Sequence, residues 1–224
     1  MSDVLDVGVD TFIPPERTRR PVTAVLRATV ARLADTDLEH AIDALVEQAE
    51  DADLPEVELE ITGRTPTHAA NELLEKAGVS GPPVPVEELA RRCGVLVLYR
   101  DLPDSLSGLV FALDGGGVIG INARHHLNRQ HFSLAHELGH FLLGHHQGGI
   151  GNEDRFHIDS SDAMPPGYDA GAERSANEFA AELLMPRKFV SAAFHETTDP
   201  GDLAAQFEVS EVAMGYRLVN LGLR

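Results

Sequence analysis

Residues 131–143 read HFSLAHELGHFLL, and this stretch decides both the fold and the chemistry of the chain. Its apolar residues recur with the spacing of a half-buried α-helix, which we expect to span Asn128 to Leu143. His136 and His140 are four residues apart, so on such a helix both imidazoles lie on one face and can converge on one metal ion. The stretch therefore predicts a metal-binding helix at the centre of the protein.

Glu137 gives this helix a chemical role as well as a binding role. Neutral imidazole suits zinc, and two imidazole ligands leave room for a third protein ligand and a water molecule. Glu137 directly follows the first histidine, so its carboxylate can reach that water as general base and later pass the proton to a leaving amine. The H-E-x-x-H spacing therefore favours peptide hydrolysis with Glu137 as the catalytic residue.

The best candidate for the third protein ligand is Glu173, which begins a second predicted helix that extends to Leu184. Asn177 falls on the same side of that helix, whereas its two later glutamates point away. We therefore expect Glu173 to face the metal and Asn177 to hydrogen-bond a ligand histidine, fixing the orientation of its ring. Two plainer interpretations stay open: Glu173 as a favourable acid in the first helical turn, and Asn177 as an exposed or locally capping amide.

The segments around these two helices predict an α+β fold with a small β-sheet from residues 95 to 122. Thr65 and Pro66 are typical of a helix start, and Gly78 is typical of its end. The sequence from Gly144 to Gly171 contains many glycines and aspartates and is expected to be mostly irregular. The other expected elements are a helix over Val86–Arg92, a strand over Val95–Tyr99, and a hairpin with arms at Gly108–Leu113 and Val118–Asn122.

Residues 1–64 form an acidic N-terminal extension whose role the residues do not define. Residues 1–60 hold 15 acidic side chains against 5 basic ones. We expect helices over Val22–Leu33 and Leu38–Gln48, the second capped by Asp37, and a short strand over Glu56–Thr62. We place the main domain at residues 65–195.

A C-terminal helical subdomain is expected over residues 196–224. Asp202 to Leu218 resembles a helix-turn-helix, with Ser210 as the cap of its second helix. That second helix has Arg217 as its one basic residue, whereas a DNA reader needs several basic or amide side chains there. The net charge of −18 also opposes binding to nucleic acid or to anionic membranes. We therefore expect this subdomain to pack on the main domain or to help hold a substrate.

Cysteine usage and the first residues favour the cytoplasm. Cys93 is the single cysteine, so it forms no internal disulfide and suits a reducing compartment. The start MSDVLD lacks the positive charge and the apolar run of a secretory signal. No stretch is long and apolar enough to predict a membrane helix.

The two helical motifs also carry a resemblance to a known family. Arg129 to His140, Glu173 to Asn177, and Phe179 to Pro186 resemble the ImmA/IrrE family of zinc endopeptidases. The lead-in sequences at Ala69–Gly78, Pro85–Ala90 and Ile119–Asn122 are similar to that family as well, so the resemblance covers roughly residues 65 to 224.

The resemblance implies a zincin-like, gluzincin-type metalloprotease with zinc on His136, His140 and Glu173 and with Glu137 catalytic. Manganese is the alternative ion. It further implies a bacterial or phage-related protein that cleaves a helix-turn-helix transcriptional repressor and so derepresses its genes. Two rival functions remain. One is a noncatalytic regulatory module with a structural or sensory metal site; the other is one half of a toxin–antitoxin-like pair, with residues 1–64 docking the partner.

Overall fold

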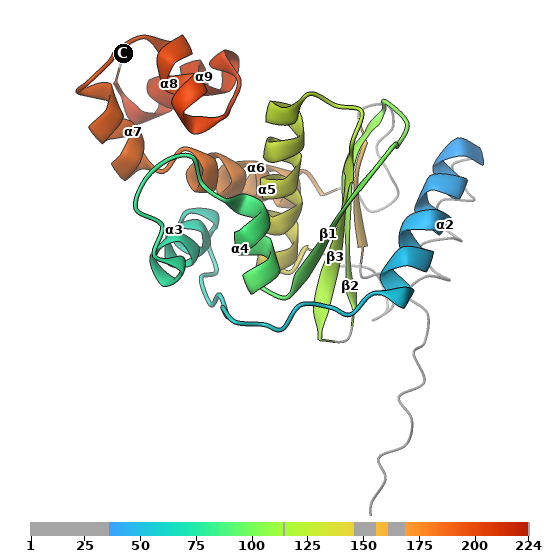
Figure 1. Ribbon diagram of the computed structural model, residues 1–224. Coiled ribbons are helices and arrows are strands. Elements are labelled where there is room, and N and C mark those ends of the chain that lie inside the picture. Colours follow the sequence, from blue (N-terminus) through green and yellow to red (C-terminus); the bar gives the residue numbers. More distant parts are fainter. Residues whose placement is uncertain (1–35, 114, 146–155, 161–168, 224) are drawn as a thin grey trace, which may run out of the picture.

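A four-stranded mixed β-sheet lies at the centre of the computed structural model, which describes residues 36–113, 115–145, 156–160 and 169–223 (Figure 1). The strand order is β1-β3-β2-β4. β2 and β3 form an antiparallel hairpin, β1 runs parallel to β3, and β4 runs antiparallel to β2. The strands are β1 (Val95–Arg100), β2 (Leu106–Leu113), β3 (Gly116–Asn122) and β4 (Phe156–Ser160). The predicted α+β class, the first strand and the hairpin are confirmed.

The described part of the chain also contains eight helices. Thr65 caps the first turn of α3 through its side chain, and Gly78 ends that helix with a left-handed φ of 73°, as the sequence predicts. The helices are α2 (Thr36–Asp51), α3 (Pro66–Ala77), α4 (Val86–Arg92), α5 (Leu127–Leu143), α6 (Ala170–Leu184), α7 (Arg187–Phe194), α8 (Pro200–Phe207) and α9 (Glu211–Leu221).

Helices cover both faces of the sheet. Successive residues of a strand point to opposite faces, so one strand can contribute buried side chains to the contacts on both faces. On one face, Val110 and Ile119 join the main core with α3, α4, α5 and α6. On the other face, Phe111 and Val118 pack with Leu45 and the rest of the buried stripe of α2 (Figure 1). The helix from the acidic N-terminal region is therefore part of the folded body rather than a separate arm.

The helices α5 and α6 approach each other closely at Gly139. A Cβ atom on Gly139 would lie 2.9 Å from Cδ1 of Phe179, which is too short for an unstrained contact. Gly117 of β3 makes a similar close contact with the ring of Phe141. Small residues at these crossings let α5 lie tightly between the sheet and α6, and this position brings residues of the two helices together.

The C-terminal helices are fixed to the main core. Leu203, Phe207, Met214 and Leu218 belong to the same buried cluster as residues of α3 to α6. Arg217 of α9 forms an ion pair with Glu182 of α6 and donates from Nε to the Met185 carbonyl oxygen at 2.8 Å. The domain boundaries expected at residues 64/65 and 195/196 stay predictions.

Several sequence predictions need correction. The strand over Glu56–Thr62 was wrong: this segment is extended but has only an isolated bridge between Val57 and Cys93. The segment from Gly144 to Gly171 contains β4, so the sheet is larger than the one expected from residues 95 to 122. Helix α2 begins at Thr36, so Asp37 lies inside it rather than capping it. The helix predicted over Val22–Leu33 lies outside the described residues.

None of the helices in the described ranges has both the length and the apolar character that a membrane crossing requires.

Candidate metal centre

The histidines of the H-E-x-x-H motif lie in the buried middle of α5. The side chain of His126 caps the start of this helix by accepting a hydrogen bond from Asn128 N at 3.2 Å, and Gly144 ends it with a left-handed φ of 75°. His136 is 4% exposed, and Glu137 and His140 are fully buried. Buried polar residues in an otherwise apolar helix need partners, so their position indicates a functional site rather than a chance match to the motif.

Helix α6 brings Glu173 to the same place. Asp169 caps this helix, with its Oδ1 atom accepting hydrogen bonds from the backbone of Gly171 at 2.7 Å and of Ala172 at 3.4 Å. Glu173 therefore sits in the first turn, and its carboxylate points toward α5. Glu173 does occupy the first turn of the helix, as the plainer interpretation has it. Its contacts with two histidines are not explained by that position alone and indicate a role in the site.

His136, His140 and Glu173 form a group whose possible ligand atoms all lie within 4.8 Å of one another. Nε2 of His136 is 3.0 Å from Nε2 of His140, and these nitrogens are 3.4 Å and 3.5 Å from the Glu173 carboxylate oxygens. Around a tetrahedral zinc ion with bonds of about 2.1 Å, neighbouring ligand atoms are about 3.4 Å apart. The three side chains therefore fit one metal ion with little rearrangement.

Asn177 fixes the tautomer of the first histidine. Its Oδ1 atom lies 3.1 Å from Nδ1 of His136. An amide oxygen only accepts, so Nδ1 carries the proton and Nε2 presents its lone pair toward His140 and Glu173. This is the orienting contact that the sequence predicts for Asn177, on the side of the ring opposite the possible metal.

His145 makes the corresponding contact with the second histidine. Its Nδ1 atom is 3.2 Å from Nδ1 of His140, and the two rings meet edge to face with centroids 5.0 Å apart. Because it approaches the Nδ1 side, His145 lies behind the ring rather than among the three ligand atoms. This geometry favours a supporting role for His145 over that of an additional ligand.

Glu137 is held between α5 and the sheet, next to Gly108 of β2. A Cβ atom on Gly108 would lie 3.1 Å from Cγ and 3.2 Å from Oε1 of Glu137. Any larger residue at position 108 would press on the carboxylate. Sequence reasoning assigned Gly108 only to a hairpin arm, although a glycine inside an apolar strand often marks such a close approach.

Comparison with known proteins agrees with this geometry. The family model of the IrrE N-terminal-like domain, a peptidase family designated M78, matches residues 90–219. The match begins in α4, includes all four strands and the three residues of the metal group, and ends in α9. No curated protein matches the chain. Because the match covers more than half of the chain and supports a metallopeptidase, we conclude that this protein belongs to the IrrE N-terminal-like family of peptidases.

Proposed function

We propose that this protein is a zinc-dependent endopeptidase with a zincin-like active site, in which His136, His140 and Glu173 hold the metal and Glu137 is the general base. The observation that carries the proposal is the convergence of three ligand atoms from two helices next to a buried carboxylate. Family membership supports the same class of activity.

The chemistry divides between the metal and the side chains. A zinc ion in such a site supplies Lewis-acid polarisation of the scissile carbonyl and makes a water molecule easier to deprotonate. Glu137 accepts the proton of the attacking water at its carboxylate and delivers it to the leaving amine. Asn177 and His145 keep the two imidazoles oriented through their Nδ1 atoms.

The noncatalytic alternative is less well supported. A structural zinc site is normally closed by a fourth protein ligand, whereas a catalytic site leaves one position for water or substrate. Among the described residues, the metal group has three members, and His145 lies behind the His140 ring. This arrangement favours an enzyme.

The substrate that we propose is a helix-turn-helix transcriptional repressor, whose cleavage would derepress its genes. The resemblance to the ImmA/IrrE family motivates this choice, and the proposal places the enzyme in the cytoplasm, where its buried single cysteine suits a reducing compartment. We do not expect direct DNA binding, because Arg217, the basic residue of α9, is engaged by Glu182.

The test is to incubate the zinc-loaded protein with a purified helix-turn-helix repressor from the same organism. We expect the wild type to cut this protein and the Glu137→Gln variant, loaded with the same amount of zinc, to leave it intact. If Glu137→Gln cuts at the wild-type rate, Glu137 is not the general base. If wild type with a full equivalent of bound zinc leaves the protein intact, this substrate assignment is wrong.

A further inference from the structure

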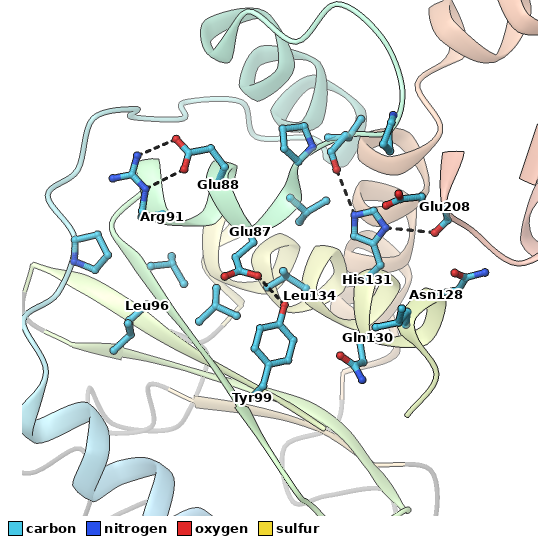
Figure 2. A pocket seen from close by; sticks show the side chains of 18 residues that line it. Glu87, Glu88, Arg91, Leu96, Tyr99, Asn128, Gln130, His131, Leu134 and Glu208 are labelled. Atoms are coloured by element: carbon cyan, nitrogen blue, oxygen red, sulfur yellow. Dashed lines mark hydrogen bonds and ion pairs between the residues drawn. The ribbon is translucent and has the colours of Figure 1, made fainter. Parts of the chain in front are cut away.

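A groove lies on the side of α5 that faces β1, away from the metal group. It has a volume of about 1040 Å³ and is formed by β1, α4, the first two turns of α5 and the turn between α8 and α9 (Figure 2). Its apolar lining includes Val84, Val95, Val97, Tyr99, Leu127 and Leu134. None of the residues of the metal group lines it. The groove is therefore a separate surface feature of the molecule.

The strand β1 presents an open edge to this groove. The Gly94 and Arg100 carbonyl oxygens accept hydrogen bonds from Gly117 and Ala123, so the even-numbered residues of this segment bond toward β3. By strand alternation, Val95, Val97 and Tyr99 direct their backbone groups to the other side. Within residues 36–113, 115–145, 156–160 and 169–223, no strand pairs with that side of β1. Such an edge is a template for another extended chain.

Large apolar side chains are exposed at the rim of the groove. Leu127, the first residue of α5, is 74% exposed, and Tyr99 of β1 is 36% exposed. Figure 2 shows the Tyr99 ring standing between β1 and α5, with its hydroxyl donating to Glu87 at 3.0 Å. Exposed apolar side chains beside an open strand edge are the two features by which proteins bind an extended peptide.

The charge of the groove selects the kind of peptide. Glu87, Glu88 and Glu208 line it, and the guanidinium of Arg91 is already paired with Glu88 at 2.8 Å and with Glu58 at 3.4 Å. The remaining charge is negative, so the groove is complementary to lysine and arginine side chains and unfavourable for nucleic acid.

We infer that this groove is a docking site for an extended, basic segment of the protein substrate, which adds to the sheet along the free edge of β1. Every second side chain of the segment would enter the groove, where apolar side chains would contact its lining and basic ones would face Glu87 and Glu208. This inference rests on the proposed peptidase function, because it assigns the groove to the capture of the substrate at a distance from the bond that is cut.

The first test measures binding of a peptide probe by fluorescence anisotropy. The probe is a fluorescein-labelled hexapeptide of alternating lysine and valine, and its glutamate–valine counterpart is the charge control. We expect the full-length protein to bind only the basic probe, and Glu87→Lys with Glu208→Lys to weaken binding about tenfold. The matched control is Glu75→Lys with Glu196→Lys, which makes the same charge change at exposed positions outside the groove lining. Equal weakening by both double variants would overturn the inference.

Two modified probes test pairing with β1 without changing the protein. N-methylation of either the lysines or the valines removes the backbone N–H groups along one edge of the extended peptide. Docking on β1 predicts that one methylated probe loses binding and the other keeps it; equal binding of both would contradict it. If deletion of residues 1–35 raises affinity for the unmodified probe, the groove is occupied by this chain's own N-terminal segment, and the assignment to a substrate is wrong.

Kinetics separate this inference from the proposed function. With the helix-turn-helix protein as substrate, Glu87→Lys with Glu208→Lys should raise KM several-fold and leave kcat unchanged. Cleavage with an unchanged KM would leave the peptidase proposal standing and remove the docking site. Probe binding without any cleavage by the zinc-loaded wild type would remove the peptidase proposal and leave the groove as a peptide-binding site.

Discussion

The Oδ1 atom of Asn177 lies 3.1 Å from Nδ1 of His136, on the side of the imidazole opposite His140 and Glu173. This hydrogen bond joins α6 to α5 and decides which nitrogen of His136 presents its lone pair toward His140 and Glu173. The same helix that supplies Glu173 therefore also prepares His136 as a ligand.

Replacing Asn177 should weaken metal binding without unfolding the protein. In Asn177→Ala, Nδ1 of His136 loses its acceptor, so the ring can turn or change tautomer, and zinc affinity should fall about 10- to 100-fold. Competition with a fluorescent zinc chelator measures this change. Asn220→Ala, at an exposed position of α9, is the control and should bind zinc as the wild type does. Wild-type affinity in Asn177→Ala would show that the hydrogen bond does not position the ligand.

Gly108→Ala should damage catalysis more than metal binding. The added methyl group would lie 3.1 Å from Cγ of Glu137 and would displace the carboxylate, while the three possible ligands stay in place. A displacement of this kind should lower kcat by about 100-fold. Gly81→Ala is the matched control, since a Cβ atom there meets nothing within 4 Å. If both variants have the same kcat, Gly108 does not make room for Glu137.

The ion pair between Arg217 and Glu182 should contribute strongly to stability. The side chains are 11% and 9% exposed, and Glu182 also accepts a hydrogen bond from the backbone of Arg187 at 3.3 Å. Arg217→Ala would leave a buried carboxylate without its cation and should lower the free energy of unfolding in urea by about 3 kcal/mol. Arg91→Ala, which removes an arginine that is 50% exposed, should cost less than about 1 kcal/mol. Similar losses in the two variants would contradict this account.

Glu72 should make stability depend on pH in the acid range. A hydrogen bond from Lys76, assisted by the backbone of Gly63 and Thr62, lowers the pKa of Glu72 from 4.5 to about 2. Because the folded pKa is the lower one, the stabilisation is complete above pH 4.5 and is lost as pH falls from there toward 2. Urea unfolding at several pH values should show a shallower acid loss for Glu72→Gln than for wild type. If the free energy of unfolding falls with pH in parallel for the two proteins, Glu72 has the same pKa in the folded and unfolded states.

The candidate site residues could be selected from the sequence because helical periodicity relates them in two pairs. His136 and His140 are one turn apart, and so are Glu173 and Asn177, so each pair needs no knowledge of the tertiary fold. Caps such as Thr65 and Ser210 are equally local, and both are confirmed. What the sequence could not supply is the meeting of the two helices, which depends on the fit of Phe179 against Gly139.

The errors concern features that depend on distant partners. Alternation between Glu56 and Thr62 is compatible with a strand, but the segment makes an isolated bridge from Val57 to Cys93 rather than a ladder with another described strand. The strand β4 was missed because it is defined by its pairing with β2, not by a strong local pattern. The role of Arg217 was missed for a similar reason, since Glu182 is distant in sequence and adjacent only in the folded protein.

The most direct test of the central claim is to measure bound zinc and cleavage activity on the same preparations of wild type, Glu137→Gln and Glu173→Gln. The account predicts one zinc ion per chain in the wild type and in Glu137→Gln, cleavage by the wild type alone, and at least about tenfold weaker zinc binding in Glu173→Gln. If Glu173→Gln binds zinc as tightly as the wild type, or if Glu137→Gln cleaves at the wild-type rate, the assignment of ligands and catalytic base is wrong.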